Sequence, residues 1–206
     1  MYKALIFDLG KVLIHFDFKR GYRALEALCP YPVDEIPRRM AANDLVVRFE
    51  TGLVEPHDFV AQLSRQLDFS VDYDRFCEIW SSIFSETLIP ESMLEALAAR
   101  YRLLLLSNTN AIHFEMVRDR YPLLRHFHHL VLSYEVKAMK PSEAIFRAAL
   151  DRAGCLPGEC FYTDDILEYV EAARRLGIDA VQFESAAQLQ RELAARGIDY
   201  EKKTVD

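Results

Sequence analysis

The amino-acid sequence predicts an α/β fold in which helices cover a parallel β-sheet and further helices are inserted after the first strand. Short, nearly continuous apolar runs alternate with longer amphipathic stretches, which is typical of buried parallel strands joined by helices. One long gap between the first two runs contains only amphipathic stretches. The chain has 206 residues, enough for one such domain with a modest insertion.

Apolar runs at residues 4–7, 103–106, 130–132, 160–162 and 180–183 are expected to form the sheet. Amphipathic stretches at residues 91–100, 110–119, 142–153, 166–176 and 186–195 are expected to be the helices of this part. Pro141 near a helix start and Gly177 at a helix end agree with these bounds. The expected core is therefore Rossmann-like, an open parallel sheet with helices on its faces.

The insertion is expected to contain helices at residues 18–28, 35–49, 55–67 and 73–84, separated by Pro30, Pro32, Gly52 and Pro56. No strand of the buried type is expected within it. We assign residues 1–15 and 88–206 to the core and residues 16–87 to the insertion. The insertion should lie beside the carboxyl end of the first strand, where open parallel sheets bind ligands.

Composition narrows the classes of partner. Hydrophobic residues make up 51% and charged residues 28% of the chain, as in a globular protein with a core. A net charge of −7 disfavours nucleic acid as a partner but permits a small phosphorylated ligand. No apolar run is long enough to span a membrane, no signal peptide is evident, and the four cysteines form no Cys-x-x-Cys pair. We expect a cytoplasmic protein with reduced thiols and no membrane partner.

The first segment with chemical potential begins at Asp8, directly after the first strand. An aspartate at this position points into the crevice, and the backbone N–H groups of Leu9 and Gly10 are free to hold an anion. An aspartate that only caps a local turn would give the same pattern.

Two further segments could bind a phosphate. Ser107 and Asn108 end the second apolar run, and their hydroxyl and amide groups could hydrogen-bond phosphate oxygens or simply cap the next helix. Lys140 opens a helix, where a cation opposes the helix macrodipole. A bound phosphate would explain this lysine, although a solvated side chain is the alternative.

The fourth segment is the pair Asp164 and Asp165, at the end of a strand. Adjacent carboxylates repel each other unless a cation lies near them, which favours a Mg²⁺ site. A double-aspartate helix cap would also produce this pair.

The order of these segments, strand-Asp, strand-Ser, Lys and strand-Asp-Asp, resembles the haloacid dehalogenase (HAD) superfamily. The helical insertion is similar to the cap domain of its capped branch. Within that branch, five segments resemble bacterial α-D-glucose-1-phosphatases and the N-terminal phosphatase domain of soluble epoxide hydrolases: FDLGKVLIHFD, RFETGLVEPHDF, LLLLSNTN, MKPSEAIF and DDILEYVEAARRLG.

The resemblance implies a phosphoric monoester hydrolase that acts on a small phosphorylated metabolite, such as a sugar 1-phosphate. Asp8 would be the nucleophile that forms an aspartyl-phosphate. Mg²⁺ would be bound by Asp8, Asp165 and the Gly10 carbonyl, with Asp164 as an additional candidate. Catalytic Lys140 would bind the transferred phosphate. Further phosphate contacts are implied for Leu9, Gly10, Ser107 and Asn108.

Two positions depart from the family pattern. Gly10 stands where related phosphatases carry a second Asp as general acid and base, followed by Lys11 and Val12 instead of Gly-Thr. Either the substrate has a good leaving group, or His15 or Asp17 transfers the proton. Tyr169 stands where relatives often have Asn or Asp near the metal.

Two other functions stay open at this point. A 2-haloacid dehalogenase also uses an Asp nucleophile but needs no metal, and Asp164 with Asp165 argues against it. A non-catalytic protein that binds a phosphorylated ligand would be compatible with Gly10, Lys11 and Tyr169. The substrate and the oligomeric state do not follow from the sequence.

Overall fold

A computed structural model describes residues 1–199 of the protein. Five parallel strands form the central sheet in the order β5-β4-β1-β6-β7. They are β1 (Ala4–Phe7), β4 (Arg102–Ser107), β5 (His129–Leu132), β6 (Cys160–Asp164) and β7 (Asp179–Gln182). The strand β1 lies at the centre, because it pairs with both β4 and β6. The predicted α/β fold is confirmed.

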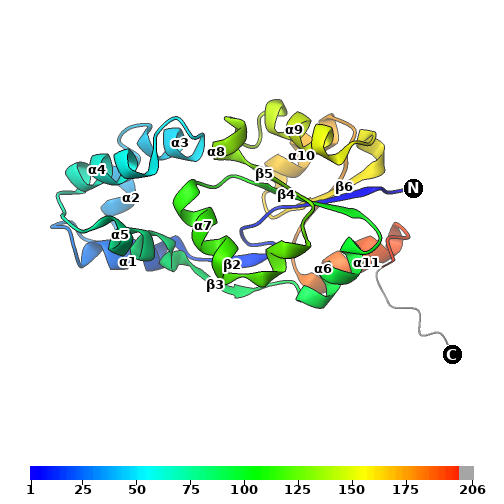
Figure 1. The fold of residues 1–206 in the computed structure, drawn as a ribbon, viewed down its shortest axis with the longest axis horizontal. Helices are drawn as coiled ribbons and strands as arrows, with labels where there is room; N and C mark the ends of the chain where they lie inside the picture. Colours follow the sequence, from blue (N-terminus) through cyan, green and yellow to red (C-terminus); the bar gives the residue numbers. More distant parts are fainter. Residues whose placement is uncertain (200–206) are drawn as a thin grey trace.

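Helices cover both faces of the sheet (Figure 1). The helices α9 (Glu143–Ala153) and α10 (Leu167–Arg175) lie on one face, and α6 (Glu91–Ala98) and α11 (Ala186–Ala195) lie on the other. Side chains of β1 alternate between two hydrophobic clusters, since successive residues of a strand point to opposite faces. Ala4 and Ile6 belong to the α9 and α10 side, whereas Leu5 and Phe7 belong to the α6 and α11 side. The central strand is thus buried on both faces.

Residues between the first two sheet strands fold into a second helical unit with its own core. It contains α1 (Phe18–Glu26), α2 (Ile36–Met40), α3 (Leu45–Glu50), α4 (Pro56–Leu67) and α5 (Tyr73–Trp80), drawn in blue to green at one end of Figure 1. Aromatic rings fill its centre, where Phe49 stacks on Phe59 with ring centroids 4.0 Å apart. The predicted helical insertion after the first strand is therefore present, and we call these helices the cap.

The cap differs from the prediction in two helices. The helix expected at residues 35–49 is two helices, α2 and α3, separated by a turn. The helix expected at residues 73–84 ends at Trp80 and continues only as a short 3-10 turn, η1 (Ser81–Ile83). Apolar periodicity continues across both breaks, so the sequence pattern does not reveal them.

An antiparallel ribbon joins the cap to the sheet. Its strands are β2 (Ile14–Phe16) and β3 (Phe84–Thr87), with Ile14 opposite Thr87 and Phe16 opposite Phe84. This ribbon was not predicted from the sequence, because each strand is short and its partner lies about seventy residues away. The proposed boundaries at residues 15 and 88 fall at this ribbon, and the division itself stays a prediction.

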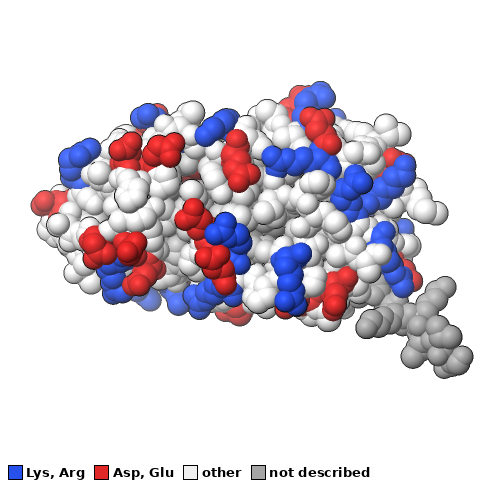
Figure 2. Space-filling model, viewed as in Figure 1, with Lys and Arg blue, Asp and Glu red and all other residues white. Residues whose placement is uncertain are grey.

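The remaining core elements are short or peripheral: α7 (Ala111–Arg120), α8 (Ser133–Val136), and the 3-10 turns η2 (Pro122–His126) and η3 (Pro157–Glu159). Within residues 1–199, every helix is too short or too polar to cross a membrane. Charged side chains of both signs are scattered over the whole face shown in Figure 2. Acidic and basic side chains are thus interspersed on this face.

Candidate active site

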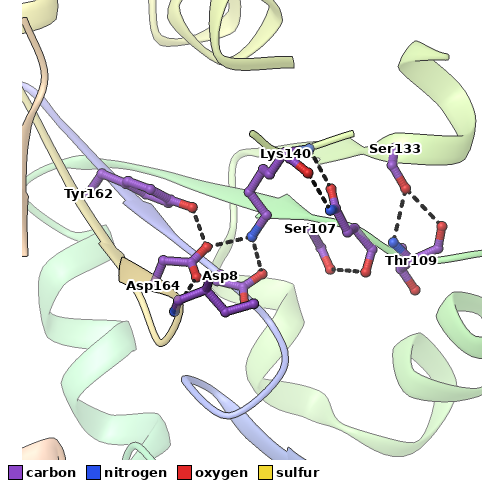
Figure 3. A network of polar contacts seen from close by, with 9 residues as sticks. Asp8, Ser107, Thr109, Ser133, Lys140, Tyr162 and Asp164 are labelled. Atoms are coloured by element: carbon purple, nitrogen blue, oxygen red, sulfur yellow. Dashed lines mark hydrogen bonds and ion pairs between the residues drawn. The ribbon is translucent and has the colours of Figure 1, made fainter. Parts of the chain in front are cut away.

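Residues from the four predicted segments meet at the carboxyl end of the sheet (Figure 3). Asp8 follows β1, Ser107 ends β4 and Asp164 ends β6, so three neighbouring strands deliver them to one edge. The backbone N–H of Asp8 donates to the Thr163 carbonyl at 3.0 Å, which continues the β1–β6 pairing up to the site. Sheet order therefore explains why side chains distant in the sequence become neighbours.

Lys140 connects two of the carboxylates. Its Nζ donates to Asp8 Oδ1 at 2.7 Å and to Asp164 Oδ2 at 2.6 Å. The side chains of Lys140 and Asp164 are 1% and 0% exposed, so these ion pairs are closed to bulk water. The contacts of Lys140 therefore lie inside the candidate site rather than in solvent.

The expectation that Lys140 opens a helix is wrong. Helix α9 begins at Glu143, and Ser142 caps it by accepting the Ala144 N–H. Lys140 lies in the preceding loop, so the macrodipole argument does not apply to it. The two carboxylates, rather than a helix end, account for its buried charge.

The side chain of Asn108 fixes the backbone of Lys140. Asn108 Oδ1 accepts the Lys140 N–H at 2.8 Å, and Asn108 Nδ2 donates to the Lys140 carbonyl at 3.0 Å. Both polar groups of the Asn108 amide are thus engaged in positioning the lysine. Ser107 is buried beside it at the end of β4, with a 3.4 Å contact from its Oγ to the Asn108 carbonyl.

Two tyrosines support the cluster, and the sequence analysis did not assign either role. The Tyr162 hydroxyl, inside β6, donates to Asp164 Oδ2. Asp164 Oδ1 also accepts the Ile166 N–H at 2.9 Å, so this carboxylate is held on both oxygens. The ring of Tyr169, the second departure from the family pattern, lies 5.1 Å from Lys140 Nζ, a cation–π distance. Tyr162 lies two residues before Asp164 in an apolar strand, and this position gives no sign in the sequence that its hydroxyl donates to the Asp164 carboxylate.

A close contact with Phe16 explains the glycine at position 10. A Cβ atom on Gly10 would lie 2.4 Å from Cε1 of Phe16, well inside van der Waals contact. The aromatic ring thus fills the space into which a second aspartate would project. Lys11 follows with φ of 57°, a left-handed conformation that favours glycine, and its Nζ lies 5.3 Å from the Phe16 ring centroid.

Leu9 and the two candidate proton donors have defined partners of their own. Leu9 is buried, and its carbonyl accepts the N–H groups of Leu13 and Ile14 in the turn after β1. Asp17 caps α1 by accepting the Lys19 N–H at 2.9 Å. His15 Nδ1 lies 2.9 Å from Ser85 Oγ across the ribbon. The contacts of His15 and Asp17 therefore belong to the connection between sheet and cap.

Burial dominates the electrostatics of the cluster. Burial raises the pKa of Asp8 to about 7; the charge of Asp164 acts in the same direction, and Lys140 opposes it. Burial alone would lower the pKa of Lys140, but the carboxylates of Asp8 and Asp164 outweigh it and raise that pKa. Burial and the neighbouring Asp164 raise the pKa of the half-buried Asp165 as well. The cluster is thus short of positive charge.

This charge imbalance and the donor atoms fit a divalent cation. Carboxylate oxygens of Asp8, Asp164 and Asp165 lie within 4.8 Å of one another. Lys140 is the ammonium that contacts this group directly, so three carboxyl groups face one ammonium. Hard oxygen donors are the ligands that Mg²⁺ prefers, and the Gly10 carbonyl follows Asp8 by two residues.

The sequence matches the haloacid dehalogenase-like hydrolase family over residues 2–177. The chain belongs to this family. This match and the site geometry confirm the superfamily resemblance. The finer likeness to α-glucose-1-phosphatases and epoxide hydrolase domains stays a prediction.

Two relatives and a solved structure extend the comparison. The chain is 24% identical over 200 residues to a D-ribitol-5-phosphate phosphatase of Bacteroides thetaiotaomicron, covering 94% of this chain and 97% of the relative. It is 26% identical over 208 residues to a phosphatase of Mycobacterium tuberculosis, covering 94% of each chain. A crystal structure of a HAD family enzyme of B. thetaiotaomicron, in complex with magnesium and inorganic phosphate, superposes with a TM-score of 0.80. That enzyme is 28% identical, and the alignment covers 90% of this chain and 96% of that one. These phosphatase relatives support the assignment of this chain as a phosphatase, a hydrolase of phosphate esters.

Proposed function

We propose that this protein is a magnesium-dependent phosphatase that hydrolyses a small phosphorylated metabolite through an aspartyl-phosphate on Asp8. The observation that carries the proposal is the buried contact of Lys140 with both Asp8 and Asp164, beside Asp165. It supports a site in which a nucleophilic carboxylate, a phosphate-binding ammonium and an acidic metal-binding group share one strand edge. The phosphatase relatives support the same reaction class.

In the proposed first step, a carboxylate oxygen of Asp8 attacks phosphorus, and the bond from phosphorus to the leaving-group oxygen breaks. Water then attacks the phosphorus of the aspartyl-phosphate, which releases inorganic phosphate and regenerates the Asp8 carboxylate. Lys140 would hold phosphate oxygens by its charge, and Ser107 and the N–H groups of Leu9 and Gly10 would add hydrogen bonds. Asn108 would act chiefly by fixing the Lys140 backbone, given its two hydrogen bonds there.

The metal would be held by the carboxylates of Asp8 and Asp165 and by the carbonyl of Gly10, with Asp164 as a further candidate. When bound, Mg²⁺ supplies positive charge that lets an anionic nucleophile approach an anionic phosphate. The donor set of this site, three carboxylates within 4.8 Å of one another, matches that ion.

The Phe16 ring beside Gly10 bears on the choice of substrate. Because the Phe16 ring fills the space beside Gly10 and no carboxylic acid stands at position 10, a substrate with a good leaving group needs least help with protonation. Sugar 1-phosphates, suggested by the resemblance, and polyol phosphates, suggested by the D-ribitol-5-phosphate phosphatase relative, are the reference substrates. We place the reaction in the cytoplasm, and we propose no nucleic-acid or membrane partner.

One alternative is 2-haloacid dehalogenation, which would also use Asp8 but no metal. The acidic cluster of Asp8, Asp164 and Asp165 favours the phosphatase. The other is a non-catalytic protein that binds a phosphorylated ligand, for which the Phe16 ring in place of the usual acid is the supporting observation.

The test is a phosphatase screen of sugar phosphates, polyol phosphates and aryl phosphates, with Mg²⁺ and with EDTA. Wild-type protein should release phosphate only with the metal, and Asp8→Asn should reduce release to the background rate. Release of chloride from 2-chloropropionate in EDTA would support the dehalogenase instead. Tight binding of phosphate analogues by wild-type protein, without turnover of any substrate, would support the non-catalytic function.

A further inference from the structure

A cavity of about 250 Å³ lies between the cap and the core, and the site described above does not use it. Helices α1, α3 and α5 of the cap and the start of α7 in the core form its walls. Most of the lining is apolar, and three aromatic rings contribute to it, those of Phe18, Tyr22 and Trp80. Its volume is below the range of about 300–1,000 Å³ that suits drug-sized ligands, so it fits one small group.

Two chains of contacts place this cavity next to the Asp8 site. The Phe16 ring, which fills the space beside Gly10, packs on Phe18 of the cavity wall with ring centroids 4.9 Å apart. On the other side, Ser133 Oγ lies 2.6 Å from the Glu50 carbonyl and accepts the Thr109 N–H at 2.9 Å. Thr109 directly follows Asn108, which fixes Lys140. The cavity wall and the Asp8 site are therefore connected by packed side chains on two sides.

Glu50 is the charged residue of the cavity wall, and its carboxylate has no partner. Within residues 1–199, the Glu50 carboxylate makes no hydrogen bond or ion pair, although its backbone carbonyl accepts from Ser133. Burial alone accounts for the raised pKa of the Glu50 carboxyl group, which is about 7. Glu50 is partly buried, and its carboxylate oxygens are not among the buried polar atoms that lack a partner. A ligand that enters the cavity with a hydrogen-bond donor would pair with this carboxylate.

Three other side chains with polar atoms line the cavity: His113, Trp80 and Tyr22. His113 is neutral, because burial lowers its pKa to about 4. Its Nε2 lies 2.9 Å from the Trp80 carbonyl and its Nδ1 lies 3.1 Å from Asn110 Nδ2, so both ring nitrogens are engaged. The Trp80 Nε1–H is buried and has no partner among the described residues, so it can donate to a ligand. The Tyr22 hydroxyl is the remaining polar group, and its pKa is raised by burial and by the charge of Glu50.

We propose that this cavity binds the leaving group of the substrate and selects an apolar alcohol or phenol that carries one ammonium group, which pairs with Glu50. The proposal rests on the phosphatase function and narrows its substrate class. An ammonium donates to the carboxylate and is also attracted by aromatic faces such as those of Phe18, Tyr22 and Trp80. A sugar or polyol would bring several hydroxyl groups to a mostly apolar wall whose polar groups are Glu50, the Tyr22 hydroxyl and the Trp80 N–H, and each hydroxyl left unpaired is penalised.

Three aryl phosphates with almost the same leaving-group acidity test this selection. They are 4-(2-aminoethyl)phenyl phosphate, 4-(2-hydroxyethyl)phenyl phosphate and 4-ethylphenyl phosphate, with D-ribitol 5-phosphate as the polyol comparison. The wild-type protein should turn over the amine with a kcat/KM about 10- to 100-fold higher than the ethyl compound, the value of a charge-assisted hydrogen bond. The hydroxyethyl compound should lie between them, and the polyol should be the poorest.

Glu50→Gln keeps the shape of the side chain and removes its charge. This variant should lose the preference for the amine through a higher KM for that compound, so that its kcat/KM for the amine falls to about that for 4-ethylphenyl phosphate. Turnover of the ethyl compound also shows that the variant is folded. Glu55→Gln is the matched control, because Glu55 is an exposed cap residue whose side chain makes no capping bond. It should retain the full preference.

The outcomes separate this inference from the proposed function. Turnover of all four compounds with no amine preference, or with an equal effect of Glu50→Gln on all of them, would overturn the inference and leave the phosphatase intact. Preference for the polyol would overturn it as well. Absence of turnover with every compound in the wider phosphatase screen would remove the proposed function itself.

Discussion

Replacement of Lys140 by methionine removes the ammonium that joins Asp8 to Asp164 and keeps the length of the side chain. The lysine makes ion pairs of 2.7 and 2.6 Å, and its side chain is 1% exposed. Loss of one partner from a buried ion pair typically costs about 3–5 kcal/mol, because the remaining charge stays buried without a counter-ion. We therefore expect Lys140→Met to lower the free energy of unfolding by that amount at pH 8 in EDTA. Phosphatase activity should fall about 10²–10³-fold.

The assay is urea unfolding at pH 8 and at pH 5, each with EDTA. The pKa of Asp8 is about 7 even with Lys140 present, and loss of the ammonium raises it further. Asp8 then binds a proton at pH 5, so the destabilisation should be smaller there than at pH 8. Lys3→Met is the matched control, since Lys3 forms an ion pair of similar length, 2.8 Å, with Glu159 on the surface. Its unfolding midpoint should match that of wild type.

Two results would refute this reasoning. Equal unfolding free energies for Lys140→Met and wild type at pH 8 would mean that the buried carboxylates do not depend on the lysine. A destabilisation that grows toward pH 5 would mean that the charges of Asp8 and Asp164 are not its source.

Three further changes have defined outcomes. Burial raises the pKa of Glu50 from 4.5 to about 7, so the unfolded chain loses this proton first and stability falls as pH rises through that window. Between pH 4.5 and pH 8, the free energy of unfolding of Glu50→Gln should fall by about 2–3 kcal/mol less than that of wild type, measured by urea unfolding. An equal fall in both proteins would contradict this prediction. Gly10→Ala should cost about 1–3 kcal/mol through its clash with Phe16, and adding Phe16→Leu should recover part of it in a double-mutant cycle of thermal unfolding. Purely additive effects would argue against that contact. Mg²⁺ at 100 times its Kd should stabilise wild type by about 2.7 kcal/mol, and Asp165→Asn should need much more metal for the same thermal shift. Identical titrations would exclude Asp165 as a ligand.

Local patterns in the sequence predicted much of the fold. The run at residues 4–7 matches β1 without a change of bounds, and the amphipathic stretch at residues 186–195 matches α11 in the same way. Both patterns depend on burial of the chain's own residues, on two faces for a strand and on one face for a helix. The ribbon of β2 and β3 could not be predicted in this way, because it pairs two segments that are far apart in the chain.

The sequence by itself determined the fold class, the order of the four chemical segments and the residue types that could hold a phosphate and a divalent cation. Strand ends in a parallel sheet share one edge, so Asp8, Ser107 and Asp164 could be expected to meet. Only the tertiary structure decided how they meet. Lys140 forms ion pairs with two carboxylates and does not lie at a helix end. The Phe16 ring fills the space beside Gly10 where a second acid would lie. These contacts depend on side chains whose distances are set by packing between distant segments, and one-dimensional spacing holds no information on those distances.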